Sequence, residues 1–192
     1  MTASGIRFEV INAGFELQLL MANASNDEVR LIAIQRKVEE YLEEEAHNRG
    51  IDVELLIVEK LSTAIDPEVR KEIYVSNAEL LLSEAFKYLS KGDLLQASEK
   101  GWGACASIVK AYGEKVGMEH YRHRQLEEIM TKLIRETKRS GNAEYKDLIK
   151  DWSVCLRLHS NFYEGVMSAE DVEESLNVVR DFVNRMREIV KG

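Results

Sequence analysis

Residues 94–115 read LLQASEKGWGACASIVKAYGEK, and this stretch decides the fold. Its pattern is helical, although Gly101 and Gly103 lie at its centre, where each glycine costs roughly 1 kcal/mol relative to alanine. Small side chains at such positions let another helix approach closely, and the packing gained can offset that cost. Trp102 between the two glycines predicts a large anchor. We therefore expect a helix with a tightly packed neighbour.

Helical patterns continue on both sides of this stretch. Asp66 and Pro67 are a start signal for one helix, and the Ser168–Asp171 pair is a capping pattern for the last. Gly92 and Asp93 end one helix and cap the next. The expected helices cover residues 67–89, 94–115, 121–139, 143–162 and 169–190. Short connections favour antiparallel neighbours, so residues 66–192 predict an all-α, antiparallel up-and-down helical bundle.

The N-terminal third reads differently. Residues 26–65 predict a two-helix segment with a break at Gly50. Residues 1–25 include an alternating pattern around Asn12–Gly14, which predicts either a short hairpin or a poorly ordered leader.

Composition and charge restrict the function. The net charge is −8, which disfavours a general nucleic-acid binder. No apolar run approaches the length of a membrane span, and Met1–Gly5 lacks the basic start of a signal peptide. With only two cysteines, Cys105 and Cys155, we expect buried, reduced thiols and a cytoplasmic protein.

Common catalytic and ligand motifs are absent. The sequence contains no phosphate loop, dinucleotide fingerprint, C-x-x-C or H-E-x-x-H motif, so no cofactor is expected. His120 and His123 could share a helical face and bind a metal, but a third ligand is not evident, and we expect no metal site. Arg122, His123 and Arg124 could instead hold an anion at a helix start.

Two further clusters have both a functional and a structural interpretation. Residues 157–164 gather polar side chains around His159 near a helix end, either as a site or as a cluster that closes the bundle. Lys132, Arg135 and Arg139 lie on one helical face, which predicts a solvated surface more readily than an RNA or phosphate surface.

The segments GDLLQASEKGWGACASIVKAYGEKVG (92–117), HRQLEE (123–128) and LHSNFYEG (158–165) carry a family resemblance. The chain resembles the archaeal PaREP family (first type), small helical proteins placed in or near the HEPN superfamily. The segment RGIDVELLIVEKLSTAIDPEVRKEIY (49–74) is similar to the lead-in of that family. The resemblance spans about residues 38–187 and implies a HEPN-like bundle, often a homodimer.

The resemblance implies binding rather than catalysis. HEPN ribonucleases use an R-x(4–6)-H motif, and no histidine of this chain has an arginine at that spacing. We therefore expect a non-enzymatic protein that binds a protein partner or a nucleotide or RNA phosphate, with a HEPN-type nuclease as the alternative. A third hypothesis is a structural dimer formed through Gly101, Gly103, Ala104 and Ala106. Residues 26–63 are also similar in order to a ribbon-helix-helix domain, but their 10 acidic and 5 basic residues disfavour DNA binding.

Side chains in the family-like segments are the candidate binding residues. Basic and imidazole groups would neutralise an anion, aromatic rings would stack or pack, and we expect these groups to converge. The candidates are Lys100, Trp102, His123, Arg124, His159, Asn161, Tyr163 and Glu164.

Overall fold

The computed structural model describes residues 34–49, 51, 53–61, 64–143 and 145–192. The described part of the chain consists of helices and turns without a strand. It divides at Asp66 into two compact units, residues 1–66 and 67–192. The predicted hairpin or leader, residues 1–25, lies outside the described residues. The predicted all-α fold is confirmed.

In the N-terminal unit, α2 (Arg36–Arg49) packs against α3 (Val53–Lys60). Ile34 and Gln35 precede the first of these helices and are not helical. Two ion pairs join the helices: Arg49 contacts Glu59, and Lys60 Nζ lies 2.6 Å from Glu45 Oε1. The described residues of this unit therefore form two helices, and the boundaries predicted for the segment, 26–65, stay a prediction.

The C-terminal unit contains the predicted helices. These are α4 (Pro67–Ser90), α5 (Leu94–Lys115), α6 (His123–Arg139), α7 (Tyr145–Glu164) and α8 (Ala169–Lys191). The predicted caps of α5 and α8 are present: Gln96 N donates to Asp93 Oδ1 at 3.1 Å, and Asp171 N donates to Ser168 Oγ at 3.1 Å. Two helices begin two residues later than predicted: α6 at His123 rather than residue 121, and α7 at Tyr145 rather than residue 143.

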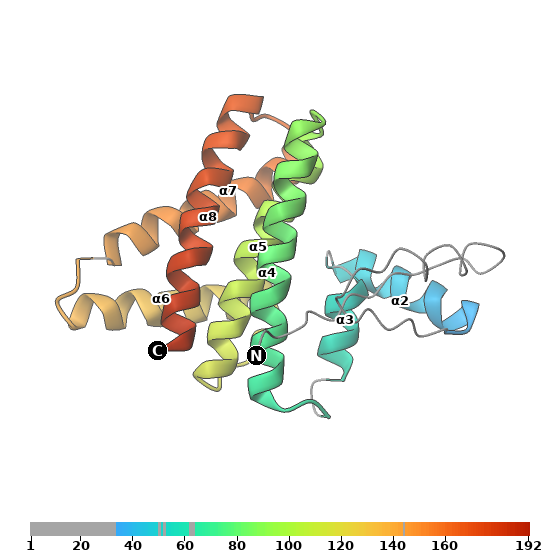
Figure 1. Ribbon diagram of the computed structural model, residues 1–192, viewed down its shortest axis with the longest axis horizontal. Helices are drawn as coiled ribbons and strands as arrows, with labels where there is room; N and C mark the ends of the chain where they lie inside the picture. The colour runs from blue at the N-terminus through green and yellow to red at the C-terminus, as the bar shows by residue number, and fades with distance from the viewer. Residues whose placement is uncertain (1–33, 50, 52, 62–63, 144) are drawn as a thin grey trace, which may run out of the picture. The chain divides into compact units, whose positions relative to one another are not determined.

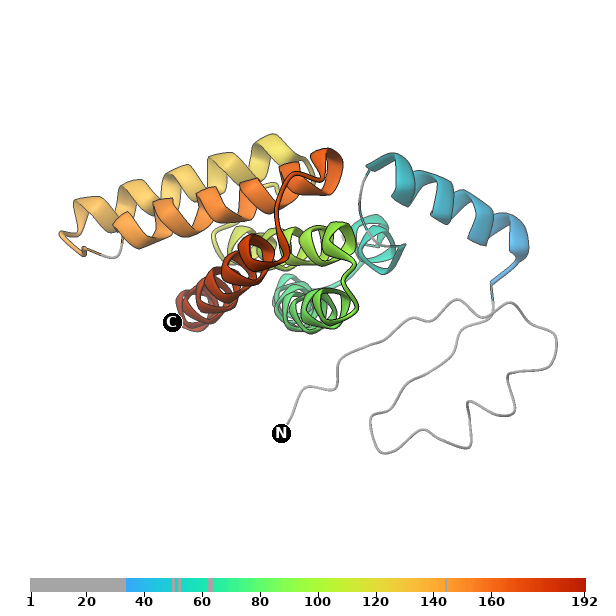
Figure 2. The same cartoon turned by 90° about the horizontal axis from the view of Figure 1, so that it is seen from above.

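α5 is the centre of this unit and contacts each of the other four helices. Figure 1 shows α4 and α5 side by side, and Figure 2 shows the antiparallel α6–α7 pair forming a separate layer over α5 and α8. α5 is buried on most sides from Ala97 to Gly113. Each neighbouring helix of α5 buries one face in the core. In α4 the buried residues are Tyr74, Ala78, Leu81 and Ala85. Along α8 one apolar face is buried, which includes Val172, Leu176, Val179, Phe182, Val183 and Met186.

The small residues of α5 are used inside this unit. A Cβ atom added to Gly101 would lie 2.6 Å from Leu176 Cδ2 of α8 and 3.0 Å from Leu158 Cδ1 of α7. A Cβ atom at Gly103 would lie 3.0 Å from Leu81 Cδ1 of α4, and Ala104 is fully buried. These contacts occupy the stripe that was predicted to form a dimer, so the dimer hypothesis based on these residues is wrong. Close packing within one chain explains the glycines.

The two cysteines correct a second prediction. Cys105 of α5 and Cys155 of α7 are both fully buried and form a disulfide, with their Cα atoms 6.2 Å apart. The predicted burial is confirmed, but the expected reduced thiols are wrong. The pairing depends on the packing of α5 against α7, which the separation of 50 residues in the sequence does not reveal.

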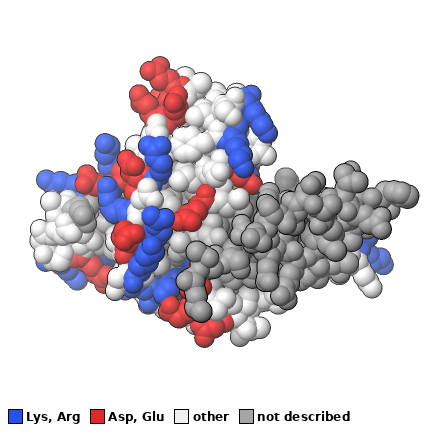
Figure 3. Space-filling model, in the orientation of Figure 1, with Lys and Arg blue, Asp and Glu red and all other residues white. Residues whose placement is uncertain are grey.

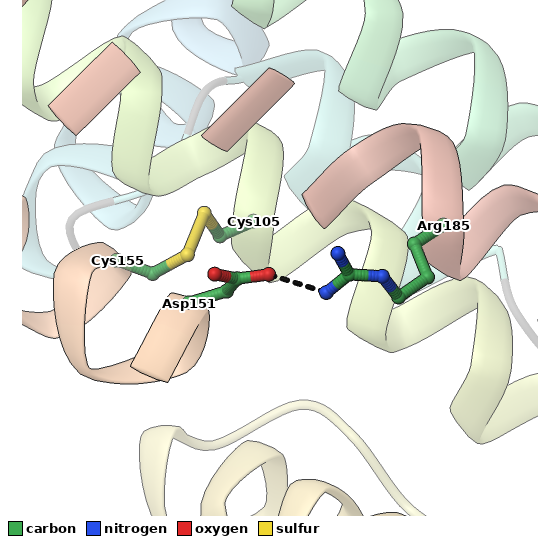
Figure 4. Close-up of a disulfide and its surroundings, with 4 residues drawn as sticks. All are labelled: Cys105, Asp151, Cys155 and Arg185. Carbon is green, nitrogen blue, oxygen red and sulfur yellow. Dashed lines mark hydrogen bonds and ion pairs between the residues drawn. A yellow bond between two sulfur atoms is a disulfide. The ribbon is translucent and has the colours of Figure 1, made fainter. Parts of the chain in front are cut away.

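A partly buried ion pair lies beside this disulfide. Arg185 Nη1 of α8 donates to Asp151 Oδ2 of α7 at 2.5 Å, and Figure 4 shows the pair next to the sulfurs. Burial raises the pKa of the Asp151 carboxyl, while the Arg185 guanidinium acts in the opposite direction. The ion pair thus fastens α7 to α8 at a partly desolvated position.

Charges of both signs are interspersed over the face shown in Figure 3, with an acidic patch over the start of α8. Glu170 and Asp171 contribute to the first turn of that helix, where negative charge is favourable. No described helix is long and apolar enough to cross a membrane.

Replacing Gly101 by alanine tests the close approach of the helices. We expect Gly101→Ala to lower the free energy of unfolding by about 1–3 kcal/mol, because overpacking against Leu158 and Leu176 exceeds the propensity gain of alanine. Gly103→Ala, which meets only one side chain, is the matched control and should cost less. Urea denaturation measures both. Equal or stabilising effects would contradict the packing argument.

Candidate functional site

Aromatic and imidazole rings from three helices meet on one side of α5. We name the group of Trp102, His123, Trp152, His159 and Tyr163 the Trp102 cluster. The Trp102 ring lies 5.0 Å from that of His123, 5.5 Å from Trp152 and 4.7 Å from His159, measured between centroids. The His123 and His159 rings are 5.0 Å apart, and Tyr163 is 5.4 Å from His159.

Each helix places its ring for a local reason. Trp102 of α5 follows Gly101, whose small size lets α7 approach α5 closely at Leu158. His123 is the first residue of α6, so its side chain projects from a helix end. Trp152, His159 and Tyr163 are spaced by seven and four residues on α7, a spacing that places them along one helical face.

The Trp102 cluster is graded in exposure from the core to the surface. Trp102 is 9% exposed and Trp152 5%, whereas Tyr163 is 67% exposed. His159 is half-buried and His123 exposed. Trp152 Nε1 also donates to Glu127 Oε2 of α6 at 3.1 Å. A ligand at the surface would therefore meet the two imidazoles and the Tyr163 ring, with the tryptophans forming the floor.

Burial lowers the pKa of the His159 imidazole, and the neighbouring His123 ring adds to this effect. The neutral form is consequently favoured, so His159 offers a ring nitrogen lone pair and an N–H near neutral pH. Its ring contacts are aromatic.

The structure brings together four of the eight predicted site residues: Trp102, His123, His159 and Tyr163. Their role in binding stays a prediction. Arg124 follows His123 directly but is exposed and paired with Glu128 at 2.9 Å. Glu164 is the exposed last residue of α7, next to Tyr163.

Lys100 and Asn161 have structural partners elsewhere. Lys100 Nζ lies 3.4 Å from Glu84 Oε2 of α4. Asn161 is 1% exposed: its Nδ2 donates to Ser98 Oγ at 2.9 Å, and its Oδ1 accepts from Met167 N at 2.8 Å. Asn161 thus ties α7 to α5 and to the connection before α8.

The predicted pairing of His120 and His123 on a helix does not occur, because α6 begins only at His123. His120 is 3% exposed, with Nδ1 2.8 Å from the Met118 carbonyl and Nε2 3.2 Å from Glu114 Oε1. Among the residues described, no group of three or more His, Cys, Asp or Glu side chains could hold a metal ion.

Lys132, Arg135 and Arg139, the basic residues predicted to share a face of α6, line an open groove of about 440 Å³. Acidic side chains alternate with basic ones along it, as expected for a solvated surface. The lining residues are Arg124, Glu127, Glu128, Thr131, Lys132, Arg135, Glu136 and Arg139.

Two features of the site were missed by the sequence analysis. Trp152 was not singled out, although its seven-residue spacing from His159 placed both on one helical face. The disulfide one turn away had no usable sequence signal.

A model of the archaeal PaREP1/PaREP8 family matches residues 73–183, which is more than half of the chain. The chain belongs to this family. The match runs from α4 into α8 and includes every residue of the Trp102 cluster, whereas the N-terminal unit lies outside it. The PaREP resemblance expected from the sequence is therefore confirmed. No curated protein and no solved structure matches the chain.

Asn161 provides a test of the scaffold under the site. We expect Asn161→Ala to reduce the free energy of unfolding by about 2–3 kcal/mol, because the buried Met167 N–H and Ser98 hydroxyl lose their partner. Ser160→Ala, at the exposed neighbouring position, should change it by less than about 0.5 kcal/mol. Urea denaturation compares the two variants, and similar losses would argue against a structural role specific to Asn161.

His159 predicts a dependence of stability on pH. Its pKa is lower in the folded protein than the ordinary value of 6.5, so the unfolded chain binds the proton more readily. The His159 contribution to stability is complete above pH 6.5 and is lost as the pH falls below it. Unfolding free energies at pH 8 and pH 5.5 should therefore differ less in His159→Gln than in the unaltered protein. Equal differences in the two proteins would contradict this assignment.

Proposed function

We propose that this PaREP-family protein is a non-enzymatic, HEPN-like binding protein that uses the surface of the Trp102 cluster to hold a nucleotide. The observation that carries the proposal is the convergence of two imidazoles and an exposed tyrosine ring from α6 and α7 over the Trp102 floor. Rings from separate helices, with centroids 4.7–5.5 Å apart, form a fixed platform rather than a mobile surface group.

The chemistry of the platform suits a nucleotide. A base has two aromatic faces that can stack on the Tyr163 ring or an imidazole. A phosphate would lie at the start of α6, where His123, Arg124 and the helix amides supply hydrogen-bond donors and positive potential. The net charge of −8 supports a small ligand over a long nucleic acid, whose many phosphates would be repelled.

Binding is favoured over nuclease activity. A general base needs a partner that orients it, and the ring contacts of His159 are with aromatic side chains and His123. The R-x(4–6)-H motif is also missing from the sequence. A HEPN-type nuclease therefore remains the disfavoured alternative.

An exposed apolar surface next to the cluster favours a protein partner as a second candidate function. Leu95, Tyr163 and Val166 are 43%, 67% and 80% exposed. Gly165, next to Val166 in the sequence, lies close to Leu95: a Cβ atom added to it would be 3.5 Å from Leu95 Cδ2. Exposed apolar patches often mark interaction sites. The homodimer suggested by the HEPN resemblance could use this patch.

A cytoplasmic location is also part of this proposal. The buried disulfide does not oppose it, because intracellular proteins of hyperthermophilic archaea contain such bonds.

A thermal-shift experiment with AMP, ATP and inorganic phosphate tests the nucleotide proposal. Ligand at about 100 times its Kd should raise the melting temperature by roughly 5–10 °C. His159→Ala and His123→Ala should lose most of this shift, whereas Glu173→Ala, at an exposed position of α8, should keep it. No shift in the unaltered protein, or an equal shift in His159→Ala, would sink the nucleotide proposal. Analytical ultracentrifugation of the unaltered protein and of Val166→Asp would then test whether the protein self-associates through this patch, which the substitution should prevent.

A further inference from the structure

The disulfide lies one helical turn from the candidate site on both of the helices that it joins. Cys105 follows Trp102 by three residues on α5, and Cys155 precedes His159 by four residues on α7. Trp152 lies one turn before Cys155 on the same helix. The bond is therefore flanked along α7 by the two rings that contact Trp102, at 5.5 Å for Trp152 and 4.7 Å for His159. Figure 4 shows the bond bridging the two helices.

The two oxidation states require different spacings between the helices. Bonded sulfurs lie about 2.0 Å apart, whereas non-bonded heavy atoms prefer about 3.5–4 Å. Both cysteines are 0% exposed, and interiors are close-packed with little spare volume. The neighbouring turn is also full, because Gly101 abuts Leu158 and Leu176. Separation of two thiols must therefore shift side chains or the helices themselves, and Trp102 and His159 are one turn away.

Contacts elsewhere keep α7 in place when the disulfide is reduced. Asn161 Nδ2 donates to Ser98 Oγ of α5 at 2.9 Å, on the far side of His159 from the bond. Arg185 Nη1 donates to Asp151 Oδ2 one turn before Cys155. These contacts hold both flanks of the bond, so reduction should loosen the middle of the α5–α7 contact without unfolding the bundle.

We infer that the Cys105–Cys155 disulfide holds Trp102 of α5 in position against the cluster residues of α7. The oxidised protein therefore binds ligand, and the reduced protein binds it weakly. This inference rests on the proposed function for its ligand. Reduction by a dithiol breaks the S–S bond: the dithiol supplies two electrons and two protons, the protein gains two thiols, and the dithiol becomes a cyclic disulfide. Because the sulfurs are buried, exchange requires opening between α5 and α7.

The experiment uses the tryptophans as a probe that needs no ligand. The chain has only two tryptophans, Trp102 and Trp152, and both belong to the cluster. The emission maximum, unlike the intensity, reports the exposure of these rings rather than quenching by the disulfide. We would compare the oxidised protein, the protein reduced with dithiothreitol and verified by a 2 Da mass increase, and Cys105→Ala/Cys155→Ala. Far-UV circular dichroism checks that each remains helical, and AMP affinity is measured well below the melting temperature.

We expect reduction to move the emission maximum to longer wavelength and to weaken AMP binding by about tenfold, a loss of about 1.4 kcal/mol. The double variant should behave like the reduced protein and should not respond to dithiothreitol. An unchanged emission maximum, or unchanged AMP affinity in a protein proven to be reduced, would overturn the inference. A shifted maximum in a protein whose oxidised form does not bind AMP would support the positioning role and reject the proposed ligand.

Discussion

The close approach of α7 and α8 to the glycine segment of α5 is the constraint on which the rest of the bundle depends. Gly101 leaves room for Leu158 and Leu176, which a single methyl group would contact at 3.0 and 2.6 Å. The glycine weakens α5 as an isolated helix, but the packing of two neighbours against it offsets this cost. A helix that contacts every other helix of its unit can hold side chains from all of them in fixed positions.

The candidate site is a consequence of this packing. Trp102 projects from the same glycine segment, and α7 is near enough to place His159 and Trp152 against its ring. The contacts that hold α7 are of several kinds: a disulfide, a buried amide network around Asn161 and the Asp151–Arg185 ion pair. Stability and site geometry are therefore linked through one helix pair, whereas in many proteins binding residues lie on loops.

Family membership and geometry contribute different parts of the functional argument. The PaREP1/PaREP8 match assigns the bundle to a family but does not identify a reaction that the protein catalyses. The geometry supplies the reason for proposing a ligand: half-buried His159, exposed His123 and exposed Tyr163 form a surface with stacking and hydrogen-bonding capacity. A buried disulfide one turn away adds a chemical variable, the redox state, that could alter this surface without changing the fold.

The sequence alone predicted the helices and most of their ends, because these depend on local propensity, caps and a 3.6-residue period. It also determined the family through the segments around Trp102, His123 and His159. The tertiary structure alone decided which of the candidate residues meet. Lys100 and Trp102 are two residues apart on α5 and so point to different neighbours, α4 for one and α6 and α7 for the other. The Cys105–Cys155 bond was likewise decided by packing, because two cysteines in different helices bond only when the helices bring their Cα atoms close, here to 6.2 Å.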